Sequence, residues 1–121
     1  MSKHPIVHIE ISAKDRVADS KFYAEVFGWE IEQIPEMSYA TFETGDGPGG
    51  GFTPITKDNP AGTVTVYIGT DDIPATLDKI VKLGGKVISP EMEIPGVGWF
   101  AIFSDLTGNQ LALFKAKEGG M

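Results

Sequence analysis

Two side chains that can exchange a proton, His8 and Glu10, lie two residues apart near the start of the chain, between apolar residues. Residues two apart on a β-strand share a face, and an imidazole with an unperturbed pKa of about 6.5 suits proton transfer near neutral pH. Tyr39 and Glu43 share one face of a later strand in the same way. If these strands are neighbours, His8, Glu10 and Glu43 can converge as catalytic bases or metal ligands; otherwise each is an ordinary polar residue of a strand or pocket.

Four aromatic side chains are candidates for lining a ligand pocket, because such pockets are mostly apolar with a few convergent polar groups. They are Tyr39, Tyr67, Trp99 and Phe103. The alternative is that they belong to the core or to the interface of a dimer, since exposed aromatic faces also mark protein contacts. The glycine run at 49–51 is not a phosphate loop, because no helix with a Lys–Ser/Thr pair follows it.

The elements that must position these side chains begin with a strand at 6–13, where apolar and polar residues alternate. Asp15 is typical of a helix N-cap and Gly28 of the residue after a helix, which predicts a helix over about 16–27. The apolar face of this helix would consist of Ala18, Phe22 and Val26, widened by Tyr23 and Phe27. Three strands are predicted to follow, at 29–34, 39–44 and about 50–55.

The same order of elements then restarts. A strand at 63–70 alternates in phase with the first one, 57 residues after His8 at Thr65, and Asp72 is the N-cap of a second helix that Gly84 closes. The apolar face of this helix would consist of Ile73, Leu77, Ile80 and Val81. Strands are predicted at 86–90, 98–104 and 109–116.

The pattern predicts an α+β fold of two βαβββ modules that form a curved, cup-shaped mixed sheet with the helices outside. Module one spans 5–56, the polar linker 57–62, and module two 63–116, within a single domain over 1–121. The strand faces turned away from the helices would line either solvent or a concavity, and their aromatic residues favour a concavity, which would hold His8, Glu10, Tyr39 and Glu43 from module one. From module two it would hold Thr65, Tyr67, Trp99 and Phe103.

Several segments resemble the vicinal oxygen chelate superfamily of glyoxalases, bleomycin-resistance proteins and extradiol dioxygenases. They are Ile6–Ile11 (IVHIEI), Phe22–Trp29 (FYAEVFGW), Asp71–Ile73 (DDI), Leu83–Val87 (LGGKV) and Asp105–Asn109 (DLTGN). The resemblance covers essentially the whole chain. The segment Ile94–Phe100 (IPGVGWF) is similar to an uncharacterised glyoxalase-like branch rather than to true glyoxalases.

In metal-dependent members of that superfamily, the first and last strand of each module supply one metal ligand each. Transfer of these four positions places them at His8, Gly51, Thr65 and Ala112. Only His8 has a side chain that binds metals well, and catalytic zinc sites use about three protein ligands. The resemblance therefore implies that the family metal site is lost, and no cofactor is expected.

Composition excludes other classes of function. The net charge is −7 with a single arginine, Arg16, and no cluster of basic residues, which argues against nucleic-acid binding. There is no cysteine, and no apolar run approaches the ~20 residues of a membrane span. The polar start, with no signal peptide, leads us to expect a cytoplasmic protein without a membrane partner.

Three functions remain for such a chain. The first is a glyoxalase/bleomycin-resistance-like protein that binds a small, mostly apolar molecule in its cup without the family metal. The second is a glyoxalase-like lyase or isomerase, in which His8, Glu10 or Glu43 abstracts a proton next to a carbonyl and a bound divalent metal stabilises the product. The third is an interaction module whose aromatic residues are buried in a dimer. A homodimer is expected, with modules paired either within one chain or across two.

Overall fold

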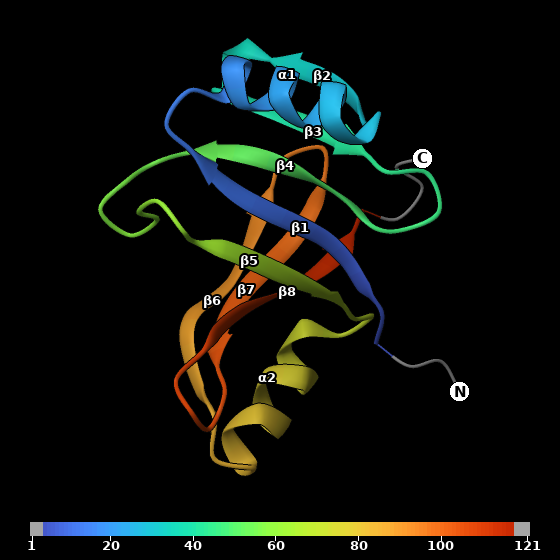
Figure 1. Cartoon of the computed structure of the whole chain (residues 1–121). Coiled ribbons are helices and arrows are strands. Elements are labelled where there is room, and N and C mark those ends of the chain that lie inside the picture. The colour runs from blue at the N-terminus through green and yellow to red at the C-terminus, as the bar shows by residue number, and fades with distance from the viewer. Residues whose placement is uncertain (1–3, 118–121) are drawn as a thin grey trace. The chain divides into compact units, whose positions relative to one another are not determined.

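The computed structural model describes residues 4–117, which form two α-helices, a short 3-10 helix and eight strands (Figure 1). The first half contains β1 (Ile6–Ala13), α1 (Arg16–Phe27), β2 (Glu30–Ile34), a short 3-10 helix (Pro35–Met37), β3 (Tyr39–Glu43) and β4 (Gly49–Pro54). The second half contains β5 (Val64–Gly69), α2 (Ile73–Lys82), β6 (Lys86–Ile94), β7 (Gly98–Ser104) and β8 (Gln110–Ala116). The α+β fold of two βαβββ modules is confirmed, and β6 extends four residues beyond its expected end.

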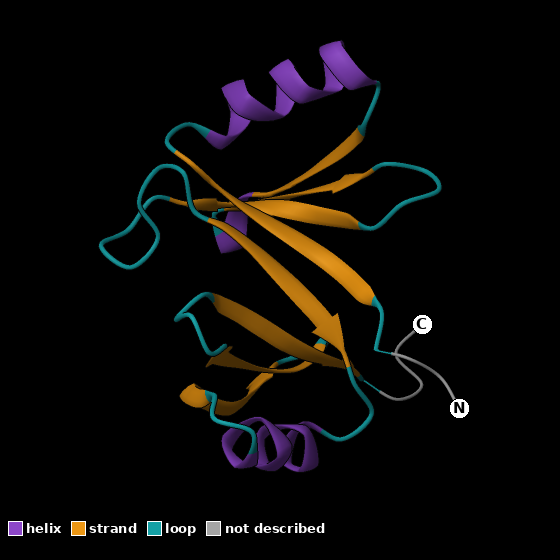
Figure 2. Cartoon of the chain, turned by 60° about the horizontal axis from the view of Figure 1, so that its bottom comes forward, coloured by secondary structure: helices purple, strands orange, loops and turns teal. Residues whose placement is uncertain are grey.

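The chain divides into two compact units, each with a mixed sheet and one helix on the sheet (Figure 2). The first unit is Val7–Thr65 and the second comprises the remaining described residues, 4–6 and 66–117. The strand order is β2-β3-β4-β1 in the first unit and β5-β8-β7-β6 in the second. The pairs β1–β4 and β5–β8 are parallel, and the other pairs within each unit are antiparallel.

The linker at 57–62 belongs to the first unit, because it is hydrogen-bonded to the end of β1. The Ser12 hydroxyl donates to the Pro60 carbonyl at 2.9 Å, and the Ser12 amide donates to the Thr63 carbonyl at 3.1 Å. The boundary between the units therefore falls at Thr65, three residues beyond the linker's expected end.

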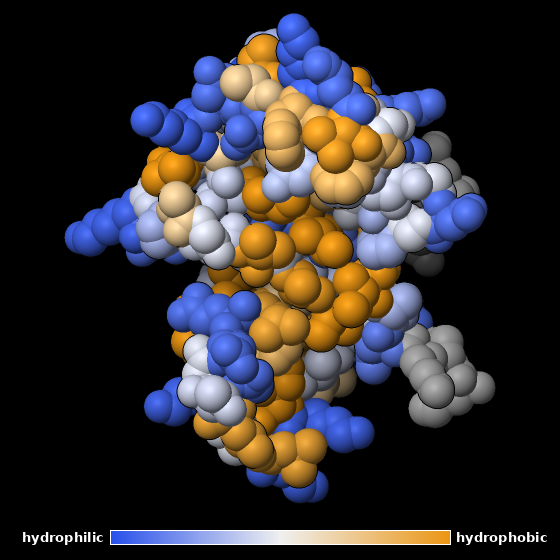
Figure 3. Space-filling view, viewed as in Figure 1, coloured by the Kyte–Doolittle hydropathy of each residue, from blue (hydrophilic) through white to orange (hydrophobic). Residues whose placement is uncertain are grey.

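Helix α1 has the expected ends but not the expected orientation. Asp15 accepts a hydrogen bond from the Ala18 amide, and Gly28 ends the helix with a φ of 75°. The predicted apolar face is wrong, because Phe22 and Val26 are 58% and 56% exposed. Figure 3 shows apolar side chains on the outer surface of this helix.

The buried face of α1 is set by polar and aromatic contacts. Ser20 is buried and accepts a hydrogen bond from the Gln33 side chain, which in turn accepts one from Arg16. Tyr23 stacks on Trp29 with ring centroids 5.2 Å apart. These contacts fix the rotation of the helix about its axis, which apolar spacing alone did not reveal.

The core of the first unit lies between α1 and one face of its sheet. It is formed by Ala13, Ala40, Phe42 and Phe52, with Ile9 and Ile11 packed against them. Because side chains alternate along a strand, His8, Glu10, Tyr39 and Glu43 must lie on the opposite face, as the alternation predicted. That face carries the candidate site.

The core of the second unit lies beneath α2, whose N-cap Asp72 accepts from the Ala75 amide. Its buried members are Ile73, Leu77, Ala101 and Leu113. Of the apolar residues predicted on α2, Val81 is instead 53% exposed.

Trp99 and Phe103 pack against this core, on the same side of β7 as Ala101. Their predicted position on the face turned away from the helix is therefore wrong. The physical reason is that β7 is apolar on both faces, so its alternation does not show which face meets the helix. Phe100 and Ile102 take the face opposite α2.

Within residues 4–117, neither helix is long and apolar enough to cross a membrane.

Candidate functional site

Strand β4 brings the candidate residues of β1 and β3 onto one surface. His8 is paired with Gly49, Glu10 with Gly51, and Thr41 of β3 is also paired with Gly51. Because β4 contributes glycines between its two neighbours, the surface between β1 and β3 has no side chains along this stretch. The side chains of the flanking strands can therefore meet or leave space above the β4 backbone.

A chain of hydrogen bonds joins His8, Tyr39 and Glu10. His8 Nε2 lies 2.9 Å from the Tyr39 hydroxyl, and this hydroxyl donates to Glu10 Oε2 at 2.9 Å. Since the hydroxyl gives its hydrogen to Glu10, it accepts from His8, which requires a hydrogen on Nε2. The structure thus brings together two of the predicted catalytic residues through Tyr39, which was predicted as a pocket-lining residue.

Tyr39 fits because residue 51 is a glycine. A Cβ at buried Gly51 would overlap the ring and hydroxyl of Tyr39. The phenol therefore occupies the space into which a side chain of β4 would project. One glycine on the central strand permits the contact between β1 and β3.

Burial lowers the pKa of His8 below its ordinary value of 6.5, and the nearby charge of Glu10 opposes this shift. Desolvation disfavours the imidazolium more than Glu10 stabilises it. His8 is therefore neutral at pH 7, in the state of a base or of a hydrogen-bonding side chain.

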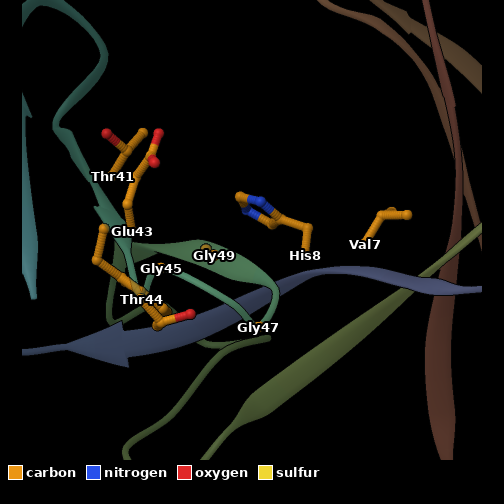
Figure 4. Close-up of a pocket in the computed structure, with 10 residues that line it drawn as sticks. Val7, His8, Thr41, Glu43, Thr44, Gly45, Gly47 and Gly49 are labelled. Carbon is orange, nitrogen blue, oxygen red and sulfur yellow. The ribbon is translucent and has the colours of Figure 1, made fainter.

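A pocket of about 380 Å³ lies beside His8 in the first unit, between the start of β1, the end of β3 and the connection from β3 to β4 (Figure 4). It is lined by Val7, His8, Thr41, Phe42, Glu43, Thr44, Gly45, Gly47, Gly49 and Gly50. In Figure 4, Glu43 and His8 stand on either side of Gly49. The pocket thus contains two of the three predicted catalytic residues, whereas Glu10 is not part of its lining.

Sequence reasoning missed most of the pocket wall. Thr41 lies between Tyr39 and Glu43 on the alternating strand, so its position on this face was available from the spacing. Thr44, Gly45 and Gly47 belong to the connection between β3 and β4, and only the folded hairpin shows that this loop borders the strand face.

The other predicted lining residues lie outside this pocket. Tyr67 is on β5 in the second unit, paired with Ala112 of β8, and Trp99 and Phe103 are partly buried and pack against the core beneath α2.

The positions transferred from metal-dependent relatives do not fit a metal. Glu10 pairs with Gly51, and its equivalent 57 residues later, Tyr67, pairs with Ala112, so Gly51 and Ala112 occupy equivalent places in the two units. Neither has a donor atom in its side chain, and Tyr39 fills the space above Gly51. Over residues 4–117, no group of three or more His, Cys, Asp or Glu side chains is arranged to hold a metal ion.

Comparisons with known proteins agree with this fold. Residues 6–45 match the family described as bleomycin resistance protein-like N-terminal. A glyoxylase-like domain-containing protein of Didymella fabae is 34% identical over 114 residues, covering 87% of this chain and 88% of that protein. A putative glyoxylase of Mycobacterium tuberculosis is 28% identical over 117 residues, covering 91% of this chain and 45% of that protein. The chain thus spans about half the length of this second relative.

A solved structure from Vibrio splendidus has a similar fold. It is described as a glyoxalase/bleomycin resistance protein/dioxygenase superfamily member, with a TM-score of 0.69, 14% identity, and coverage of 93% of this chain and 99% of that chain. Together with the relative from Didymella fabae, whose match extends over nearly the whole of both chains, these findings show that the chain belongs to the glyoxalase/bleomycin-resistance/dioxygenase superfamily, the vicinal oxygen chelate proteins.

Proposed function

We propose that this protein binds a small molecule with an apolar body in the pocket of the first unit, without a metal ion. The observation that carries the proposal is the contact between Tyr39 and Gly51, where the phenol occupies the space of a lost metal ligand and joins His8 to Glu10. Two of the three side chains considered as metal ligands, His8 and Glu10, are thereby hydrogen-bonded to the Tyr39 hydroxyl.

The size of the pocket suits a small molecule of about one ring. Ligand pockets commonly measure roughly 300–1,000 Å³, and this one, at about 380 Å³, is at the small end of that range. Gly49 contributes backbone to the pocket wall, and Val7 and Phe42 are the apolar residues of its lining. His8 and Thr41 supply hydrogen-bonding groups that can orient a polar substituent, whereas the Thr44 hydroxyl already donates to the Pro48 carbonyl at 3.1 Å.

Benzyl alcohol is a suitable test molecule, because it combines one ring with one neutral polar group. We expect it to shift the backbone amide NMR signals of Gly45, Gly47, Gly49 and Gly50 in a saturable manner. The variant Gly47→Leu should abolish these shifts. A Cβ at Gly47 meets only the Thr44 hydroxyl, at 3.4 Å, so the variant can fold, and its larger side chain is added at a residue that lines the pocket.

The matched control is Gln110→Leu, which adds a leucine at an exposed position of β8 outside the pocket. This variant should keep the wild-type shifts. Binding to wild type that persists in Gly47→Leu, or shifts confined to other parts of the chain, would overturn the proposal.

A second candidate function, abstraction of a proton next to a carbonyl, is favoured by the state of His8. Its lowered pKa leaves a neutral imidazole beside the pocket at pH 7, as a general base requires. The divalent metal of the original hypothesis has no fitting ligand set, so His8 would have to act without it. Exchange of the α-hydrogens of hydroxyacetone in D2O, lost in His8→Gln, would establish this activity; no exchange above the buffer rate would exclude it for that ketone.

A further inference from the structure

The face of the first unit that carries His8 and Glu43 is strongly acidic. Glu43 on β3 is paired directly with Glu30 on β2, and Glu32 is paired with Thr41. Directly paired residues project on the same side of a sheet, so these glutamates share the face that also carries Glu10. Strands β1 to β4 bring no lysine or arginine to this face.

Glu43 is the one acidic side chain of this face that lines the pocket. Its side chain is exposed, and among residues 4–117 its carboxylate takes part in no ion pair or hydrogen bond. The lining contains no lysine or arginine that would neutralise it. Its nearest like-charged neighbour across the sheet is Glu30, and like charges placed directly opposite each other are mutually destabilising. A bound cation would relieve that repulsion.

The pocket places this carboxylate at one end of a short open surface. Glu43 and His8 flank β4 on its two sides, and two strand spacings put their Cα atoms roughly 10 Å apart. Gly49 lies between them and has no room for a side chain, because a Cβ there would meet the Phe42 carbonyl and the Glu43 backbone. A small ring held in the pocket between His8 and Glu43 can carry a substituent that reaches the Glu43 carboxylate.

We propose that the pocket selects a cationic ligand, a protonated amine on a small apolar body, whose N–H group donates a hydrogen bond to the Glu43 carboxylate. A hydrogen bond between an ammonium group and a carboxylate is stronger than one between neutral groups, while an anionic ligand would be repelled by the four glutamates of this face. A single carboxylate cannot enclose a metal ion, which needs several ligands. This inference rests on the proposed function and specifies its ligand class.

Three molecules of the same shape test it: benzylamine, which is cationic at pH 7, neutral benzyl alcohol, and anionic benzoate. Titrations followed at the Gly45, Gly47, Gly49 and Gly50 amides should give benzylamine an affinity about three- to tenfold above that of benzyl alcohol, with benzoate the weakest. The advantage of the amine should shrink as salt is raised, because the Glu43 carboxylate is exposed.

The variant Glu43→Gln should reduce the affinity ratio of benzylamine to benzyl alcohol to about one. Glu91→Gln, which removes the same charge from an exposed position on β6, should keep the wild-type ratio. If benzyl alcohol binds wild type as tightly as the amine, or if Glu43→Gln keeps the preference, cation selection is overturned while the proposed function stands. If none of the three molecules shifts the glycine amides, both proposals fall.

Discussion

At the scale of single residues, the site depends on the absence of a side chain at Gly51. A side chain there would displace the Tyr39 phenol, and without that phenol neither His8 nor Glu10 would have its hydrogen bond to the hydroxyl. The same position in the second unit is Ala112, which is fully buried and paired with Tyr67. Neither place has a side-chain donor atom, and a tyrosine lies beside each of them, Tyr39 at Gly51 and Tyr67 at Ala112.

This relation can be measured with a double-mutant cycle. Gly51→Ala should lower the free energy of unfolding by about 1–3 kcal/mol in urea titrations, because the new methyl group overlaps Tyr39 in a packed site. In the background of Tyr39→Ala, which removes the obstructing ring, the same substitution should cost much less. Equal costs in the two backgrounds would show that Tyr39 does not occupy the space above Gly51.

The burial of His8 makes a second residue-scale prediction, on pH. Because the folded state lowers the pKa of His8 below 6.5, the unfolded chain binds its proton more tightly than the folded protein. The contribution of His8 to stability is therefore complete above the unfolded pKa and is lost as the pH falls from about 6.5 through the lower folded value. Urea titrations between about pH 7.5 and pH 5 should show this loss.

The matched variant is His8→Gln, whose amide can still donate to the Tyr39 hydroxyl but does not titrate. The difference in unfolding free energy between wild type and His8→Gln should change with pH in favour of the variant as the pH falls. A difference that is constant over this range, or that changes in favour of wild type, would mean that burial does not destabilise the imidazolium.

At the scale of elements, only one face of β7 packs against the core beneath α2. Trp99 packs against the core beneath α2, with the Lys115 ammonium 5.9 Å from its ring centre. Trp99→Leu should therefore lower the unfolding free energy by about 1–3 kcal/mol and leave the benzyl alcohol shifts of the first unit unchanged. An unchanged stability together with weaker ligand binding would restore Trp99 as a pocket residue.

Both helices depend on an aspartate at the N-cap. The carboxylates of Asp15 and Asp72 accept from the amides of Ala18 and Ala75 at 3.1 and 2.9 Å. Replacement of either aspartate by alanine should cost about 1 kcal/mol in chemical unfolding, and replacement by asparagine much less. An alanine variant as stable as wild type would indicate that the cap contributes nothing at that helix.

The elements were largely predictable because their ends carry local signals. Asp15, Gly28 and Asp72 each act through the backbone of their own helix, so the helix bounds follow from the sequence. The rotation of α1 was not predictable, since Ser20 faces inward only because Gln33 of β2 hydrogen-bonds it. Likewise, β7 is apolar on both faces, and its packing side is decided by α2 rather than by its own residues.

The sequence predicts which strand face carries the site, but it does not predict which side chains on that face contact each other. Alternation placed His8, Glu10, Tyr39 and Glu43 on one face, and the structure agrees. Which of them meet depends on strand register, which pairs His8 with Gly49 and Glu10 with Gly51. One step of register would have moved every side chain of β1 to the other face, and no local signal fixes that choice.

At the scale of the whole molecule, the two copies of the βαβββ unit carry different residues on the sheet face opposite their helix. The first unit presents the acidic face around Glu43, whereas β7 and β8 of the second unit present Phe100, Ile102, Ala112 and Phe114 on the face opposite α2. The shared element order thus specifies the scaffold, and the residues on one face of each sheet specify what it can bind.

The homodimer expected from the sequence is a prediction at this same scale. Sedimentation equilibrium should give a particle of twice the 13.0 kDa mass of one chain. If α1 takes part in the contact, Phe22→Asp should shift the equilibrium toward the single chain, because Phe22 is 58% exposed and an acidic residue there disfavours an apolar interface. A wild-type particle of 13.0 kDa at all concentrations would contradict the dimer.

The central claim, a ligand pocket that works without a metal, is tested most directly by one NMR titration. Protein treated with a chelator is titrated with benzyl alcohol, first alone and then with Zn²⁺ or Ni²⁺ added, while the amides of Gly45, Gly47, Gly49 and Gly50 are followed. We expect saturable shifts in the metal-free protein and the same affinity after metal is added. Binding of benzyl alcohol that appears only once the metal is present would contradict the account, because it would mean that the site depends on a metal ion.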